Sequence, residues 1–409
     1  MKDVASSHRR VALYSHDTQG LGHIRRNSLI AAALVDAHPD LDVLLLTGAP
    51  EATALPLPPR TSVVQLPALS KTSAGLYRPR SMPLTLDAVV AIRSAVLEAA
   101  LIDFAPDLLV VDKVPLGIMG ELEPGLVEAR ACFGTRTVLG LRDVLDEPGV
   151  AIREWSEAGS DNVVRRHYDE VWVYSDPKVY DPALEYGWPA MVRRKIAYTG
   201  YLGRGRSRLL ARPASATGAP RVTSPEGPFV LCLVGGGQDG VTLSRAFVET
   251  RFPPGHTGVL ITGPYLDAMA RWELEAVAAD REDLTVLDFV GDVPSFVNRA
   301  AATVAMGGYN TVCELLDSGQ PVLLSPRTTP RCEQAVRAER FRSAGLVDVV
   351  TPEQLTAAHL EKWLARAVHL PRREDPEVDL RGLDRIPELA DRLLDARRER
   401  PREVNDVAV

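Results

Sequence analysis

Residues 306–326 read Met-Gly-Gly-Tyr-Asn-Thr-Val-Cys-Glu-Leu-Leu-Asp-Ser-Gly-Gln-Pro-Val-Leu-Leu-Ser-Pro. An apolar run at 303–305 precedes this stretch. Within it, a glycine pair, a helical pattern, a Gly-Gln-Pro turn and a second apolar run follow in order. A strand, a tight turn, a helix and another strand in this order form the βαβ unit of a parallel sheet. The stretch therefore predicts an α/β fold.

The same alternation of short apolar runs and helical patterns extends outward in both directions. Predicted strands lie at residues 11–15, 43–47, 62–66, 108–112, 137–141, 171–174 and 196–199, and again at 229–234, 258–261, 284–289, 303–305 and 322–324. Their near-continuous apolar character indicates parallel sheets with helices on both faces. Because 409 residues are too many for one hydrophobic core, we predict two doubly wound, Rossmann-like domains that face a cleft.

A change of composition marks the boundary between these domains. Residues 204–227 are rich in Arg, Pro, Ser, Gly and Ala and lack apolar periodicity, which is typical of an exposed linker. We predict an N-terminal domain at 1–203, a C-terminal domain at 228–379, an amphipathic closing helix at 380–398 that packs back toward the N-terminal domain, and a frayed tail at 399–409.

The composition excludes several classes of protein. A net charge of -7 and a pI near 5.7 argue against a nucleic-acid partner, which would require a basic surface. We see no signal-peptide pattern at the start and no apolar run of transmembrane length, so we expect a cytoplasmic protein. The four cysteines form no close metal-like pair and are expected to be reduced thiols.

Three glycine-rich turns follow predicted strands at the edge where ligands bind in open α/β sheets. They are Gly20-Leu21-Gly22-His23, Gly235-Gly236-Gly237-Gln238 and Gly307-Gly308-Tyr309-Asn310-Thr311. Each is either a phosphate-binding loop or an ordinary tight turn. No Gly-x-Gly-x-x-Gly motif with a ribose-binding acid is present, and no Walker-type Gly-Lys-Ser/Thr loop, which argues against a dinucleotide enzyme and an ATPase.

The third turn has polar neighbours suited to a nucleotide diphosphate-sugar. Gly307 and Gly308 leave room for a diphosphate, and the amides from Tyr309 to Thr311 begin a helix whose positive end attracts it. Glu314 is a candidate to accept hydrogen bonds from ribose hydroxyls, and Glu333 with Gln334 to bind sugar hydroxyls. The structural alternatives are dipole compensation for Glu314 and a solvated helix start for Glu333 and Gln334.

Together these motifs resemble those of the GT-B glycosyltransferases, most closely the MurG-like family of peptidoglycan enzymes that add N-acetylglucosamine to a lipid-linked precursor. The resemblance implies that Gly236, Gly237 and Gly308 to Thr311 bind the diphosphate, Glu314 the ribose, Glu333 and Gln334 the donor sugar, and the Phe289-Val290 loop the base. It also implies an acceptor-binding N-terminal domain and a nucleotide-sugar-binding C-terminal domain. The first turn is poorer in glycine than in that family, because Leu21 stands between Gly20 and Gly22.

Sugar transfer needs a base for the acceptor hydroxyl. His23 is the favoured candidate, because a histidine at a helix N-terminus is held in its neutral form by the dipole. Asp112 and Asp143 are rivals, since each closes a predicted strand at the cleft. Capping or packing is the alternative role of His23, and ion pairing that of the two aspartates. This scheme requires no metal ion and no cofactor.

We therefore predict an inverting glycosyltransferase that moves a sugar from a nucleotide diphosphate-sugar to an acceptor hydroxyl. The acceptor is a small molecule or a lipid-linked molecule, and the second would bring peripheral membrane contact. A nucleotide-sugar 2-epimerase of the same architecture and a non-catalytic sugar-nucleotide-binding protein are the alternatives.

Overall fold

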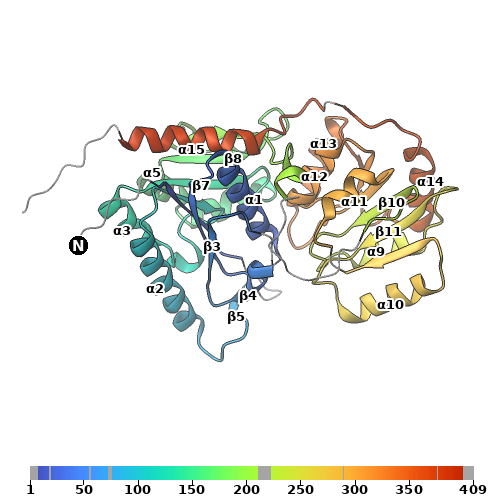
Figure 1. The fold of residues 1–409 in the computed structure, drawn as a ribbon, viewed down its shortest axis with the longest axis horizontal. Helices are drawn as coiled ribbons and strands as arrows, with labels where there is room; N and C mark the ends of the chain where they lie inside the picture. Colours follow the sequence, from blue (N-terminus) through green and yellow to red (C-terminus); the bar gives the residue numbers. More distant parts are fainter. Residues whose placement is uncertain are drawn as a thin grey trace, which may run out of the picture.

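The computed structural model describes residues 8–17, 20–54, 57–71, 76–210, 223–288, 290–374 and 376–398. These residues form two lobes side by side, each built around one parallel sheet (Figure 1). Phe289, residues 211–222 of the predicted linker and the predicted tail at 399–409 lie outside the described residues.

The N-terminal sheet has seven strands in the order β3-β2-β1-β6-β7-β8-β9, and all neighbours are parallel. They are β1 (Arg10–Ser15), β2 (Asp42–Thr47), β3 (Thr61–Gln65), β6 (Leu108–Asp112), β7 (Arg136–Arg142), β8 (Glu170–Tyr174) and β9 (Ile196–Tyr198). The strand order reverses between β1 and β6. In open parallel sheets such a switch point is where ligands bind, at the carboxyl ends of the strands.

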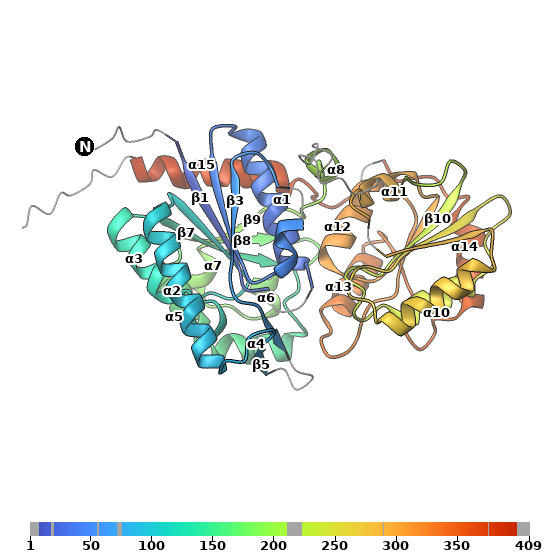
Figure 2. The same cartoon turned by 60° about the horizontal axis from the view of Figure 1, so that its bottom comes forward.

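Helices cover both faces of this sheet. On one face lie α1 (Gly22–Ala37) and α15 (Gly382–Arg398), and on the other α2 (Leu86–Phe104) and α3 (Glu123–Phe133), as Figures 1 and 2 agree. Alternate residues of β1 divide between the two layers: Val11 and Leu13 pack on the α1 side, Ala12 and Tyr14 on the α2 side. The near-continuous apolar strands are explained by this double cover.

Smaller elements complete the N-terminal lobe. They are the 3-10 turns η1 (Pro50–Ala54) and η2 (Ile118–Gly120) and the helices α4 (Pro148–Glu157), α5 (Ser160–His167), α6 (Pro182–Glu185) and α7 (Ala190–Arg193). A two-stranded antiparallel ribbon, β4 (Leu69–Lys71) with β5 (Tyr77–Pro79), also belongs to this lobe.

The C-terminal sheet has six parallel strands in the order β12-β11-β10-β13-β14-β15. They are β10 (Phe229–Leu233), β11 (Thr257–Ile261), β12 (Leu284–Leu287), β13 (Ala302–Ala305), β14 (Val322–Leu324) and β15 (Asp348–Val349). One face is covered by α9 (Val241–Val248), α10 (Ala268–Ala279) and α14 (Ala357–Ala367), the other by α11 (Val293–Arg299), α12 (Tyr309–Ser318) and α13 (Glu333–Ser343). Its switch point lies between β10 and β13.

The first residues of the predicted linker differ from the expectation of an exposed segment. They form a short helix, α8 (Arg206–Leu210), which contacts α1. Arg206 is buried there, and its guanidinium donates to the carbonyl of Leu202. The sequence did not predict this burial, because the composition of a polar segment does not show which of its side chains form tertiary contacts. Within the described ranges, no helix combines the length and apolar character needed to cross a bilayer.

Candidate active site between the two sheets

The switch points of the two sheets face each other. The amide nitrogen Nδ2 of Asn310, on the first turn of α12, donates to the carbonyl oxygen of Gly22 at the start of α1, with 2.8 Å between the two atoms. The hydroxyl of Tyr309 donates to the carbonyl of Tyr174 at 2.6 Å. Figure 2 shows α12 and α13 on the side of the C-terminal lobe nearest to the N-terminal lobe. Two helix N-termini therefore meet at the domain junction.

His23 lies on the first turn of α1 and contacts Asp112, the last residue of β6. Its ring nitrogen Nδ1 contacts Oδ2 of the carboxylate, while Arg26 donates through Nη2 to both carboxylate oxygens at 2.6 Å. Burial acts to raise the pKa of Asp112, but Arg26 and His23 outweigh it and hold that pKa well below the usual range. An ionised Asp112 selects the tautomer with the proton on Nδ1, which leaves Nε2 of His23 as an acceptor.

A second histidine is close to this pair. The rings of His16 and His23 have centroids 4.7 Å apart. His16 follows β1 and is buried; this burial, with His23 and Lys113 nearby, holds the pKa of His16 well below its usual value. The ring of His16 is therefore neutral near pH 7.

The N-terminus of α12 carries free backbone donors. Gly308 is the residue before the helix, and no side chain caps the first turn. The amides of Tyr309, Asn310 and Thr311 therefore lack intrahelical partners, as at every helix start. A methyl group at Gly308 would meet only Thr311 Oγ1, at 3.9 Å, whereas one at Gly307 would come within 3.0 Å of the Gln334 carbonyl. Gly308 thus opens onto free space, and Gly307 is required for packing.

Only part of the glycine turn after β10 is required by packing of the chain. A methyl group at Gly237 would lie 2.5 Å from the Thr262 carbonyl, and Gly237 has a φ of +98°. Gly236 is less constrained, since a methyl group there would touch only the Tyr265 ring at 3.5 Å. Gln238 is exposed, and α9 begins three residues later, at Val241. Gly235, Gly236 and Gln238 of this turn are therefore open to a ligand, and Gly237 is not.

Glu314 lies on the second turn of α12. Its side chain is buried, and among the described residues its oxygen Oε1 has no hydrogen-bond partner. Arg25 of α1 is near enough to interact with it electrostatically. A buried carboxylate oxygen without a donor requires an explanation, because such groups are nearly always paired.

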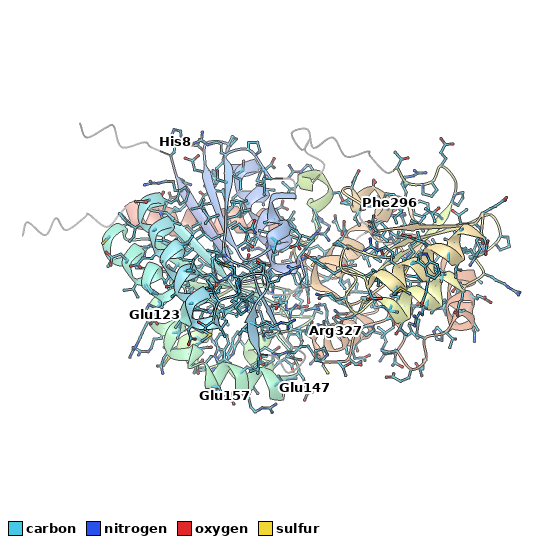
Figure 3. The ribbon with its side chains drawn as sticks, turned by 90° about the horizontal axis from the view of Figure 1, so that it is seen from below. His8, Glu123, Glu147, Glu157, Phe296 and Arg327 are labelled. Atoms are coloured by element: carbon cyan, nitrogen blue, oxygen red, sulfur yellow. The ribbon has the colours of Figure 1, made fainter. Side chains whose placement is uncertain are left out.

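Glu333 and Gln334 begin α13 beside Gly307. Glu333 contacts Arg327, which Figure 3 places between the lobes, and its oxygen Oε2 is buried and unpaired among the described residues. Burial acts to raise the pKa of Glu333, but Arg142, Arg327 and Arg337 together lower it. The side-chain oxygen of Gln334 accepts a hydrogen bond from the Arg327 amide at 3.2 Å.

The remaining predicted residues are placed differently. Asp143 is fully buried, and Arg337 of α13 donates to both of its carboxylate oxygens, at 2.6 Å from Nη2 and 2.8 Å from Nε. It therefore joins the domains and has no free oxygen turned toward an acceptor. Val290 is buried in the core and contributes no exposed side chain.

Four basic residues of the junction escaped the sequence-based reasoning as site residues: Arg26, Lys113, Arg142 and Arg337. Two of them carried a signal, because Lys113 and Arg142 stand next to Asp112 and Asp143 at strand ends. The other two lie inside helices, where a buried arginine cannot be told from an exposed one.

The chain has relatives among known proteins, but each sequence match covers only part of it. No protein-family model matches the chain. The chain is 29% identical over 102 residues to an uncharacterized glycosyltransferase of Methanosarcina acetivorans, a match that covers 25% of each protein. It is 25% identical over 174 residues to the UDP-N-acetylglucosamine–N-acetylmuramyl-(pentapeptide) pyrophosphoryl-undecaprenol N-acetylglucosamine transferase of Levilactobacillus brevis, covering 40% of this chain and 46% of that enzyme. The matches thus span less than half the length of these relatives.

Solved structures match nearly the whole chain at low identity. The glycotransferase of kitacinnamycin has a TM-score of 0.55 at 17% identity and covers 95% of both chains. MurG of Acinetobacter baumannii has a TM-score of 0.53 at 13% identity, covering 96% of this chain and 100% of that one. A UDP-N-acetylglucosamine 2-epimerase has a TM-score of 0.60 at 15% identity, covering 96% and 98%. The chain has the GT-B glycosyltransferase fold, and the relatives that its sequence resembles are glycosyltransferases.

Proposed function

We propose that this protein is an inverting glycosyltransferase that takes a sugar from a nucleotide diphosphate-sugar. The observation that carries the proposal is the position of the His23–Asp112 pair, across the domain junction from the free N-terminus of α12. In this scheme Nε2 of His23 accepts the proton of the acceptor hydroxyl. The hydroxyl oxygen bonds to the anomeric carbon as the bond from that carbon to the diphosphate breaks, and the configuration inverts.

The C-terminal lobe would hold the donor. The amides of Tyr309 to Thr311, with Gly236 and Gln238, are suited to the diphosphate, because unpaired backbone donors at a helix start stabilise negative charge on the leaving group. Glu314 would accept the ribose hydroxyls, which would supply donors to its unpaired oxygen. Glu333 and Gln334 would bind the donor sugar. The base would lie against the backbone near Val290, on the loop that also contains Phe289.

Two further assignments are part of the proposal. Transfer needs no metal ion in this scheme, because the N-terminus of α12 supplies positive charge at the diphosphate. We also propose a cytoplasmic location, which the free thiols of Cys132, Cys232, Cys313 and Cys332 support, since secreted proteins usually pair their cysteines.

A thermal-shift screen of uridine, thymidine and guanosine diphosphates tests the donor site. A ligand that binds only the folded protein raises its melting temperature, by an amount set by concentration and affinity. We expect one of these nucleotides to raise it, and Glu314→Ala to reduce that shift. No shift with any of the three would overturn the proposal.

The epimerase alternative is kept because an epimerase structure has the same fold over 96% of this chain. The matching nucleotide-sugar, incubated with the protein alone, separates the two reactions. Release of an epimer without acceptor would favour the epimerase. Nucleotide binding without transfer to any acceptor, unchanged by His23→Ala, would favour a non-catalytic binding protein.

A further inference from the structure

Three basic side chains gather at the carboxyl edge of the N-terminal sheet, beside His23. His16 follows β1, Lys113 follows β6 and Arg142 ends β7, and these three strands are neighbours in the sheet. Lys113 interacts electrostatically with both His16 and Arg142. Because the ring of His16 is neutral near pH 7, the positive charge at this edge comes from Lys113 and Arg142.

The carboxylates of this edge are already paired. Arg26 binds Asp112 and Arg337 binds Asp143, each through two or more hydrogen bonds. Glu333 is the carboxylate that acts on both Lys113 and Arg142, and its ion pair with Arg142 is long, with 3.9 Å between Nη2 and Oε1.

Lys113 and Arg142 form few contacts with negatively charged groups. The side chain of Lys113 forms no hydrogen bond or ion pair with the residues that the structure describes. Arg142 forms a long ion pair with Glu333, with 3.9 Å between Nη2 and Oε1, and Nε of Arg142 is buried without a partner in the described part of the chain. Two half-buried cations that share one distant carboxylate are costly, because burial removes their hydration.

The backbone of Lys113 is also unusual. Its φ is +67°, in the left-handed region that a residue with a Cβ rarely adopts, and its amide donates to the Gly140 carbonyl at 2.9 Å. Glycine or asparagine would fit this position with less strain. Strain of this kind concentrates at functional sites, where the side chain has a task that offsets the cost.

We propose that the acceptor carries an anionic group, a carboxylate or phosphate, which binds between Lys113 and Arg142 next to His23. This inference rests on the proposed function, since it assigns the basic edge to the acceptor. Lys113 would contact the anion as a point charge, and the guanidinium of Arg142, whose side chain is 17% exposed, would donate to it. The anion would hold the acceptor so that its hydroxyl lies near Nε2 of His23.

Competitive acetylation of the intact protein tests the site without knowledge of the acceptor. Lys113 and the exposed Lys178, as internal control, are labelled near neutral pH and quantified by mass spectrometry. The probes are citrate, inorganic diphosphate and phosphatidylglycerol vesicles. At about ten times the Kd, bound anion slows labelling of Lys113 about tenfold, because only the free protein reacts. Labelling of Lys178 should stay constant.

Each outcome decides the inference. Protection by citrate or diphosphate supports a soluble anionic acceptor, and protection by vesicles alone supports a lipid-linked one. Arg142→Gln should weaken the protection. If no probe protects Lys113, the inference is wrong. The nucleotide screen on the same samples distinguishes the two proposals. Nucleotide binding without protection of Lys113 would contradict only this inference. Protection without nucleotide binding would contradict only the proposed donor site.

Discussion

Asp112 is a buried charge whose partners determine what it can do. Arg26 and His23 approach it from α1, so the carboxylate is fixed by two side chains one helical turn apart. A carboxylate with a strongly lowered pKa does not accept a proton near neutral pH. Of the favoured base His23 and its rival Asp112, only His23 can therefore accept a proton near neutral pH in the proposed reaction, and Asp112 would orient it.

We predict that His23→Ala and Asp112→Asn each lower kcat about 10²–10⁴-fold, since both remove the same proton transfer. The double variant should lose little more than the worse single one, because residues that act as a unit are not additive. Initial rates at saturating donor measure this. Asp280→Asn, which removes an exposed aspartate at the end of α10, is the control. Additive losses would contradict a shared role.

Lys113 gives a prediction about stability and pH. Burial, together with Arg142 and Arg331, lowers the pKa of Lys113 from 10.5 to about 7. Below that folded-state pKa the ammonium is charged in both states, and the folded state bears the full cost. As pH rises from about 7 to about 10.5 the unfolded state binds more protons, so this cost disappears.

Lys113→Met should therefore raise the melting temperature most at about pH 6, by roughly 2–4 °C, and little near pH 10. Calorimetry at several pH values measures the difference. Lys178→Met should give no such trend, because Lys178 is exposed. A gain in stability that is equal at all pH values would point to packing instead of charge.

At the scale of elements, α12 connects the two candidate halves of the site. Its first turn presents free amides, Tyr309 and Asn310 contact the N-terminal lobe, and Glu314 faces Arg25 of α1. The same helix thus carries the candidate diphosphate-binding and ribose-binding residues and also contacts α1, the helix of His23.

We predict that Gly308→Ala weakens nucleotide diphosphate binding about tenfold, or roughly 1.4 kcal/mol, without loss of stability. The added methyl group meets open space in the free protein but would occupy the position proposed for the diphosphate. Calorimetric titration and a thermal melt measure the two effects. Gly227→Ala, whose methyl group meets no neighbour within 4 Å, should change neither. An unstable Gly308→Ala protein would mean that this glycine is structural.

Most strands of the two sheets could be predicted from the sequence, and the exceptions have physical reasons. The predicted strands agree with β1–β3 and β6–β14 because buried parallel strands are continuous apolar runs. β15 has only two residues, Asp348–Val349, so its sequence carries no period. The ribbon of β4 and β5 has mixed polar residues and prolines. The glycine turns were recognisable, but only tertiary contacts distinguish the open Gly308 from the packed Gly237.

At the scale of the whole molecule, a buried ion pair fixes the two lobes. Asp143 of the N-terminal lobe and Arg337 of α13 each expose about one per cent of their side chains. Arg337 also donates to the Gly307 carbonyl at 2.9 Å. Through this arginine, the loop at Gly307 is connected to the end of β7 in the N-terminal sheet.

Breaking this pair should destabilise the protein and separate its domains. Arg337→Met leaves Asp143 buried without its cation, which we expect to lower the free energy of unfolding by about 3–5 kcal/mol in urea titrations. Asp143→Leu combined with Arg337→Met should recover most of that loss, because no buried charge is left unpaired. The matched control is Arg340→Met: Arg340 pairs with Glu185 of the other lobe from the same helix but is exposed, and its loss should cost less than about 1 kcal/mol.

The double variant also separates stability from function. Without Arg337 the Gly307 carbonyl loses its donor, so a stable double variant should still show a raised KM for the nucleotide-sugar and a larger radius of gyration in solution scattering. This is expected because the ion pair positions the donor loop against the other lobe. If the double variant regains stability, compactness and wild-type kinetics together, Arg337 serves the fold alone, and the packing of α12 against α1 suffices to bring the donor loop to His23.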